Sequence, residues 1–159
     1  MKALIFAAGL GTRLKPLTDT MPKAMVPVQG KPLLVHVLRK LKQAGCKEAV
    51  VNVHHFADQI SDYLATHDFG LSVSISDERD ELLETGGGIK KAAHLLGSSE
   101  PFLVHNVDIL SNLDLAAFYA FHKPERLATL LVSERETQRY LLFNAENRLV
   151  GWTNIKTGE

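Results

Sequence analysis

Short apolar runs alternate along the chain with longer segments whose apolar side chains recur every three or four residues. The short runs predict β-strands, and the longer segments predict amphipathic helices. Strands are expected at residues 2–8, 48–53, 71–76 and 101–107, and helices at residues 32–44, 57–66, 85–96 and 114–121. Because strands alternate with helices, we expect an α/β, Rossmann-like fold with a mostly parallel central sheet and helices on both faces.

The pattern within each run indicates its place in the fold. Residues 2–8 are nearly all apolar, which is typical of a central strand covered on both faces, whereas the alternation in residues 71–76 indicates an outer strand. Three further strands are predicted at residues 127–133, 139–144 and 148–153. The last run continues into TNIKTGE without a closing helix. We therefore expect one domain over residues 1–159 whose fold is incomplete at the C-terminus.

Charge and cysteine content narrow the possible partners. Lys and Arg total 18, as do Asp and Glu, so a general electrostatic attraction to nucleic acid or to an anionic membrane is not expected. The first apolar stretch is too short for a signal peptide, and no segment approaches the roughly 20 apolar residues of a membrane span. The single cysteine, Cys46, excludes an internal disulfide and fits a packing role in a reducing compartment such as the cytoplasm.

A glycine turn follows the first predicted strand as Gly9-Leu10-Gly11-Thr12-Arg13. A dinucleotide-binding fingerprint would need a third glycine where Leu14 stands and a helix directly after it, so that interpretation fails. The G-x-x-x-x-G-K-[ST] string of a P-loop is also missing from the sequence. The remaining interpretation is a longer loop that wraps a triphosphate with its backbone N–H groups and with cationic side chains.

Two cations in this loop suit phosphate binding. Arg13 offers a planar fork for bidentate contact, and Lys23 offers a point charge. Pro16, Pro22 and Pro27 restrict the conformations of the chain around them. An isolated Arg or Lys is more often a solvated surface residue, but the whole constellation just past the first strand favours phosphate binding.

Five strings in order along the chain resemble the signature of the sugar-1-phosphate nucleotidyltransferases, the nucleoside-diphosphate-sugar pyrophosphorylases. They are GLGTRLKPLT at 9–18, PKAMVPV at 22–28, KPLLVHVL at 31–38, ETGGGI at 84–89 and FLVHNVD at 102–108. The ETGGGI string is most similar to the short bacterial enzymes that make UDP-activated N-acetylmuramic acid, with the GDP-mannose-forming guanylyltransferases as close relatives. The resemblance implies transfer of a nucleoside monophosphate from UTP or GTP to a sugar 1-phosphate, with release of pyrophosphate.

The resemblance also implies roles for individual residues. Arg13, Lys23 and Asp108 would be catalytic: Arg13 by stabilising developing charge, Lys23 by contacting the α-phosphate, and Asp108 by ligating Mg2+. Asn106 would contact the substrate, in a string that reads Asn106-Val107-Asp108 where the family usually has N-G-D. The residues implied in nucleotide binding are Ala8, Gly9, Leu10, Gly11, Thr12, Arg13, Lys23, Glu84, Thr85, Gly86 and Gly87.

Alternatives remain open at this level. Thr85 could cap the predicted helix, and Asp108 could be an ordinary turn residue. Family members usually carry a second acidic metal ligand and sugar-contacting residues further along than this chain extends, so we expect a truncated enzyme that keeps the nucleotide half. A different class of function is a binding module of the same fold that senses nucleotide or sugar phosphate without turnover. The sequence does not fix the base, the sugar or the choice between a monomer and a small homo-oligomer.

Overall fold

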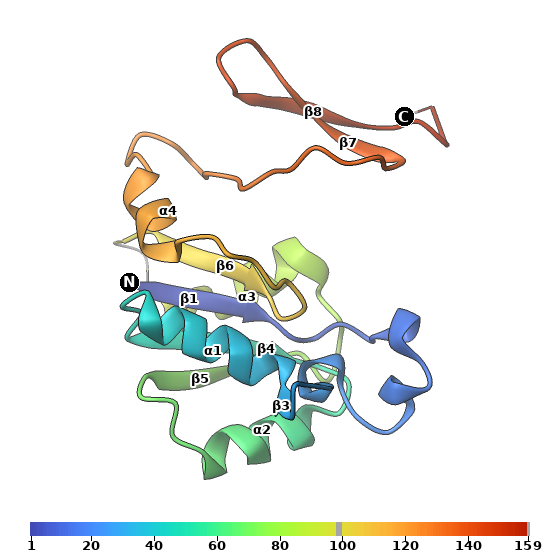
Figure 1. Cartoon of the computed structure of the whole chain (residues 1–159), viewed down its shortest axis with the longest axis vertical. Helices are drawn as coiled ribbons and strands as arrows, with labels where there is room; N and C mark the ends of the chain where they lie inside the picture. The colour runs from blue at the N-terminus through green and yellow to red at the C-terminus, as the bar shows by residue number, and fades with distance from the viewer. Residues whose placement is uncertain (98–99, 159) are drawn as a thin grey trace. The chain divides into compact units, whose positions relative to one another are not determined.

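The computed structural model describes residues 1–97 and 100–158, and the chain divides into two compact units, Met1–Arg126 and Leu127–Glu159 (Figure 1). Each unit is described by itself below. None of the helices in the described ranges is long and apolar enough to cross a membrane.

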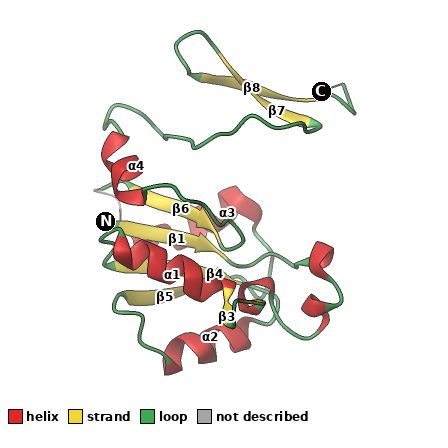
Figure 2. Cartoon of the chain, viewed as in Figure 1, coloured by secondary structure: helices red, strands yellow, loops and turns green. Residues whose placement is uncertain are grey.

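A parallel sheet of four strands forms the centre of the first unit (Figure 2). The strands lie in the order β5-β4-β1-β6, so β1 is central and β5 is an outer strand, as their apolar patterns predict. Their bounds are Lys2–Phe6 for β1, Glu48–Val53 for β4, Ser72–Asp77 for β5 and Phe102–Asn106 for β6. The sheet thus reverses its winding direction between β1 and β6.

Helices cover both faces of this sheet. The helices α1, α2 and α4 share one apolar core with the residues of β1 and β4 that face them, and α3 packs against Leu4 and Val50 on the opposite face. The helices run Leu33–Gln43 for α1, Ala57–Thr66 for α2, Glu84–Leu96 for α3 and Leu115–Phe121 for α4. Cys46 lies in the first core with 1% of its surface exposed, which confirms its packing role. The Rossmann-like α/β prediction is therefore confirmed.

The segment between β1 and α1 contains little regular structure. It has three single 3-10 turns, at Thr12–Leu14, Leu17–Asp19 and Lys23–Met25, and a two-residue antiparallel ribbon of β2, Pro27–Val28, with β3, Lys31–Pro32. This long connection brings residues 9–28 past the carboxyl end of the sheet before the chain enters α1.

The second unit contains an antiparallel hairpin of β7, Arg139–Phe143, and β8, Leu149–Asn154. Its connection is stabilised by Asn144, whose Oδ1 accepts hydrogen bonds from the N–H groups of Glu146 and Arg148. The predicted strand at residues 127–133 is wrong, because this stretch has no regular structure. An apolar run becomes a strand only where a second strand supplies hydrogen-bond partners, and β7 and β8 pair with each other.

Candidate active site

The carboxyl ends of β1 and β6 meet at the point where the winding of the sheet reverses. Ligands of open α/β sheets gather at such a switch point. Phe6 of β1 lies in register with Asn106 of β6, and a pocket of about 160 Å3 opens beside them. The pocket is lined by Phe6, Ala7, Gly9, Lys23, Asn106, Val107 and Asp108. Four residues that the sequence implicates, Gly9, Lys23, Asn106 and Asp108, are thus brought together.

The glycine turn is shaped for close approach at Gly11. Its φ of 67° lies in the left-handed region, and a Cβ there would stand 2.9 Å from Thr18 Cγ2 and 3.3 Å from Lys23 Cβ. The Thr18 hydroxyl donates to the Gly11 carbonyl at 2.9 Å, which holds the turn against the segment that carries Lys23. Glycine is therefore required at this position by conformation and by space.

Lys23 and Asp108 form an ion pair across 85 residues of sequence. The Lys23 Nζ contacts Oδ2 of Asp108, and the two side chains retain 19% and 37% of their accessible surface. Lys23 starts a 3-10 turn directly after the buried Pro22, and Asp108 comes two residues after the end of β6. Both side chains are anchored by short, well-packed segments and remain open to solvent on the pocket side.

Arg13 and Thr12 lie outside the residues that line this pocket. Both are exposed in the turn Thr12–Leu14, and the part of the chain that the structure describes gives Arg13 neither an ion pair nor a side-chain hydrogen bond. The guanidinium is thus free to meet an anion. Leu10 is also exposed, whereas the Ala8 N–H is already donated to the Asn52 side chain at 3.2 Å, so Ala8 has no free N–H for a nucleotide.

The second implicated segment begins α3. Glu84 is its first residue and has a left-handed φ of 57°, which is rare for a residue with a side chain. Thr85 lies inside the first turn and the N-cap is Leu83, so the capping role considered for Thr85 is wrong. Glu84, Thr85 and Gly86 are exposed, and none of residues 84–87 lines the pocket between β1 and β6.

Val107, which stands where the family usually has glycine, packs in the core. It is 3% exposed, its N–H donates to the Phe6 carbonyl at 3.1 Å, and its φ is not positive. Its backbone therefore continues the ladder from β6 beside β1 and needs no glycine. The turn still delivers Asp108 to the pocket.

His105 adds a neutral group next to the site. Burial lowers the pKa of His105 below its ordinary value, and a backbone hydrogen bond near Asn106 opposes that shift only in part. The ring Nδ1 lies 2.7 Å from the Asn106 carbonyl oxygen. The uncharged imidazole is therefore favoured at neutral pH, so His105 adds no positive charge near Asp108.

A hydrogen-bonded pair of buried polar residues, Asn52 and Glu78, lies next to the residues that line the pocket, and neither is among the site residues predicted from the sequence. Asn52 of β4 is 2% exposed, and Glu78, just past β5, is fully buried. Asn52 Oδ1 accepts hydrogen bonds from the N–H groups of Ala7 at 2.7 Å and Ala8 at 3.2 Å, and Asn52 Nδ2 donates to Glu78 Oε1 at 2.9 Å. A polar side chain inside the apolar run AVVNV was the available signal for Asn52. Glu78 gave none, because its neighbours in sequence are also charged.

Asp108 is the residue of this pocket that suits a metal ion. No group of three or more His, Cys, Asp or Glu residues that could hold a metal occurs among the described residues. The pocket at Asp108 therefore does not fit a metal ion whose ligands all come from the protein. It does fit Mg2+, which binds through one or two carboxylates and completes its shell with substrate phosphates and water.

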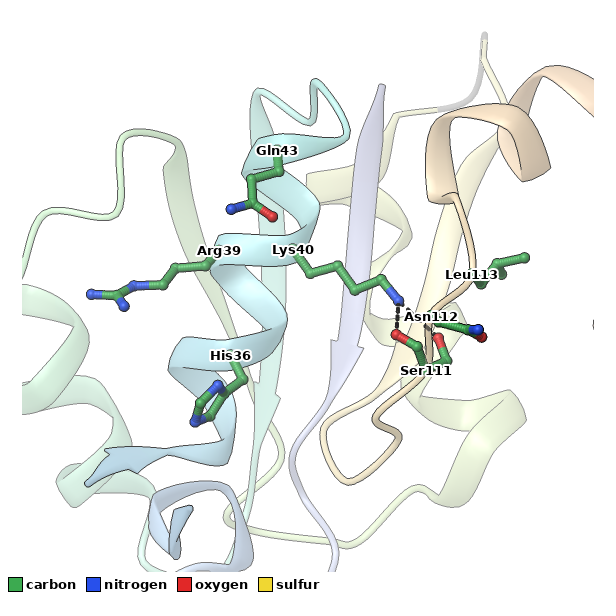
Figure 3. Close-up of a pocket in the computed structure, with 7 residues that line it drawn as sticks. All are labelled: His36, Arg39, Lys40, Gln43, Ser111, Asn112 and Leu113. Atoms are coloured by element: carbon green, nitrogen blue, oxygen red, sulfur yellow. Dashed lines mark hydrogen bonds between the residues drawn. The ribbon is translucent and has the colours of Figure 1, made fainter. Parts of the chain in front are cut away.

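A larger and more open pocket of about 410 Å3 lies between α1 and the loop after Asp108 (Figure 3). Lys40 crosses it and donates through Nζ to the Ser111 hydroxyl at 2.8 Å and to the Ser111 carbonyl. His36 and Arg39 point away from that loop. Because its polar groups do not converge, we place the active site in the smaller pocket at the switch point.

Comparisons with known proteins show the family to which the chain is related. Residues 2–145 match the sequence model of a family described as Nucleotidyl transferase. The N-acetylmuramate alpha-1-phosphate uridylyltransferase of Caulobacter vibrioides is 44% identical over 86% of this chain and 59% of its own length. The mannose-1-phosphate guanylyltransferase catalytic subunit beta of Dictyostelium discoideum is 38% identical over 77% of this chain and 34% of its own length. The crystal structure of HddC from Yersinia pseudotuberculosis matches with a TM-score of 0.66 and 35% identity, over 74% of this chain and 52% of that one.

Proposed function

Because the chain belongs to the nucleotidyl transferase family, we propose that it transfers a nucleoside monophosphate from a nucleoside triphosphate to a sugar 1-phosphate and releases pyrophosphate. The chain spans 59% of the length of the Caulobacter relative, and this activity is proposed for the whole protein. The observation that carries the proposal is the Lys23–Asp108 pair at the switch point beside Gly9.

The chain's own groups suit each part of this reaction. An oxygen of the sugar 1-phosphate attacks the α-phosphorus, the bond from that phosphorus to the oxygen bridging to the β-phosphate breaks, and pyrophosphate leaves with the electron pair. Lys23 is held at the pocket and would bind the α-phosphate, which aligns the attacking and leaving oxygens. Arg13 is exposed beside the glycine turn and would neutralise the charge that grows on the leaving pyrophosphate.

Asp108 would hold Mg2+ together with the phosphates of the nucleotide. The ion, when bound, supplies charge neutralisation and polarises the phosphoryl oxygens. Lys23 contacts the same carboxylate, so it keeps Asp108 oriented toward the pocket and compensates its charge.

Two bases and two sugars are candidates. A uridylyltransferase and a guanylyltransferase are both among the relatives, so UTP and GTP are the triphosphates to test first. The products would be of the UDP-N-acetylmuramic acid or GDP-mannose type, which serve cell-envelope polysaccharide or peptidoglycan synthesis. We propose a cytoplasmic setting because the substrates are the nucleotides of that compartment and Cys46 is a free thiol.

The experiment is a matrix of nucleoside triphosphates against sugar 1-phosphates with Mg2+, in which triphosphate binding is followed by calorimetry and turnover by pyrophosphate release. We expect metal-dependent binding of UTP or GTP, and Lys23→Ala and Asp108→Asn should each weaken it at least about tenfold, as loss of a charge-assisted contact does. Lys15→Ala is the matched control, because Lys15 belongs to the same loop but pairs with exposed Asp19 at 3.2 Å.

The outcomes separate the candidate functions. Binding that does not depend on Mg2+, without pyrophosphate release, would favour the sensing module over the enzyme. An absence of triphosphate binding, or an equal loss in Lys15→Ala and Lys23→Ala, would contradict the proposal.

A further inference from the structure

Asn52 fixes the backbone that leads into the glycine turn. The two residues between β1 and Gly9, Ala7 and Ala8, both donate their N–H groups to Asn52 Oδ1, at 2.7 and 3.2 Å. Ala7 and Ala8 are themselves buried, at 3% and 4% exposure, so these bonds replace water contacts that the N–H groups lack. The direction in which the chain enters the turn is therefore set by a side chain of the neighbouring strand, β4.

Glu78 fixes Asn52 in turn. Its Oε1 accepts from Asn52 Nδ2 at 2.9 Å, which makes the opposite edge of the amide, Oδ1, face the two alanines. Its Oε2 lies 3.4 Å from the N–H of Leu83, the residue before Glu84 at the start of α3. Glu78 is fully buried and has no salt-bridge partner within residues 1–97 and 100–158. A carboxylate in that position is stabilised by the N–H groups aimed at it, so its contacts resist displacement.

Gly88 of α3 lies directly against Asn52 and Glu78. A Cβ at Gly88 would stand 3.0 Å from Glu78 Oε1, 3.1 Å from Phe6 Cε1 and 3.2 Å from Asn52 Nδ2. The α3 backbone therefore lies directly against the Asn52–Glu78 pair, which leaves no room for a side chain between them.

We propose that Asn52 and Glu78 are positioning residues that couple the glycine turn to the start of α3, so that the two segments implicated in nucleotide binding are held in one arrangement. This inference rests on the proposed function for its effect on nucleotide affinity, whereas the coupling itself is a property of the free chain. Neither side chain lines the pocket between β1 and β6. Asn52 acts through the N–H groups of Ala7 and Ala8, and Glu78 acts through Asn52 and the N–H of Leu83.

The test exploits the direction of the Asn52–Glu78 hydrogen bond. Asn52→Asp keeps the volume of the side chain and the acceptor for Ala7 and Ala8, but it places a carboxylate where the donor to Glu78 was. The double variant Asn52→Asp/Glu78→Gln reverses donor and acceptor and restores the bond. Leu64→Ala, in α2 on the other face of the sheet, is the control for stability loss alone.

Two readouts are measured on the 159-residue chain. The first is amide hydrogen exchange without ligand: Asn52→Asp should speed exchange about tenfold both at Ala7 and Ala8, which lead into the glycine turn, and at Leu83, which precedes α3. A tenfold change corresponds to about 1.4 kcal/mol. The second is affinity for UTP and GTP with Mg2+, which should fall about tenfold. The double variant should recover most of both losses, and Leu64→Ala should show neither.

The outcomes distinguish this inference from the proposed function. If the unmodified chain binds no triphosphate, the proposed function fails, and exchange alone then decides the coupling. Faster exchange in only one of the two segments, or a double variant no better than Asn52→Asp, would overturn the inference. If Asn52→Asp does not fold, Glu78→Gln keeps the shape of the side chain and replaces one of its acceptor oxygens by a donor, and unchanged exchange at Leu83 in that variant would also overturn the inference.

Discussion

Two glycines two residues apart in the first turns of α3 should respond in opposite ways to the same substitution. Gly86 is exposed, and a Cβ there would meet nothing within 4 Å. Gly88 is buried against Glu78, Phe6 and Asn52, with Cβ contacts of 3.0–3.2 Å. Both have helical backbone conformations in which alanine is allowed, so the difference between them isolates the tight packing at Gly88.

The magnitudes follow from these contacts. Gly86→Ala should raise the free energy of unfolding by about 0.5–1 kcal/mol, because alanine loses less backbone entropy in a helix. Gly88→Ala gains the same entropy term, but its Cβ would stand 3.0–3.2 Å from the hydrogen-bonded Glu78 carboxylate, the Phe6 ring and the Asn52 amide, and such overpacking costs about 1–3 kcal/mol. The free energy of unfolding of Gly88→Ala should therefore be about 1–3 kcal/mol lower than that of Gly86→Ala. For a domain of this size this difference separates the two Tm values by about 2–12 °C.

Urea unfolding followed by far-UV circular dichroism measures both variants on equal terms. The midpoints should move in opposite directions, or Gly88→Ala should stay near the unmodified chain while Gly86→Ala rises, with the slope unchanged in each case. A Gly88→Ala chain stabilised as much as Gly86→Ala would show that Glu78 and Asn52 yield easily. That result would refute the close packing on which the proposed coupling between the glycine turn and the start of α3 depends.

Three further predictions address single side chains. Arg13→Ala should slow pyrophosphate release at least about tenfold, on the order of the loss when one charge-stabilising donor is removed, and an unchanged rate would exclude Arg13 from catalysis. Ser76→Ala should leave the free energy of unfolding unchanged or raise it, because the buried Ser76 hydroxyl has no hydrogen-bond partner among the described residues, and a clear loss in urea unfolding would reveal a partner. Burial raises the pKa of Cys46 above its ordinary 9.0, so the unfolded chain releases the thiol proton first and the free energy of unfolding should fall as pH rises through 9. In Cys46→Ala this fall should be smaller, and the part that remains should begin at higher pH because burial also raises the pKa of Tyr119; a fall of the same size would exclude the Cys46 contribution.

Elements defined by local periodicity could be predicted from the sequence almost to the residue. The strand at 48–53 and the helix at 57–66 have the expected bounds. The apolar residues that each element buries lie close together in sequence, so their spacing alone shows where the element begins and ends. The strand expected at 127–133 did not form, because strand pairing depends on a partner that the run itself cannot specify. Local pattern thus determines where a strand can occur, and non-local pairing determines whether it does.

The residues of the candidate site also differ in whether the sequence could predict their positions. Lys23 and Asp108 could be predicted to meet, because a loop after β1 and a residue after β6 emerge at the same edge of a parallel sheet. Arg13 is not among the residues that line the pocket. Its position depends on the conformation of an irregular loop, which the periodicity of the sequence does not predict. Asn52 and Glu78 were missed because their function lies in hydrogen bonds across 26 and 45 residues of sequence.

The register of the sheet shows how such residues could be found. Ser76, Asn52, Phe6 and Asn106 lie side by side across β5, β4, β1 and β6, and three of the four are polar although all face the α3 side. Each of the three polar residues is the last or the second-last residue of its strand. Asp108 comes two residues after Asn106, the last residue of β6. Asn52 and Ser76 are buried, at 2% and 3% exposure; Asn52 finds a protein partner, whereas the Ser76 hydroxyl has none among the described residues. Asn106 is exposed and faces the pocket. A polar residue near the end of an otherwise apolar parallel strand is therefore a candidate for holding the site even where it cannot touch the substrate.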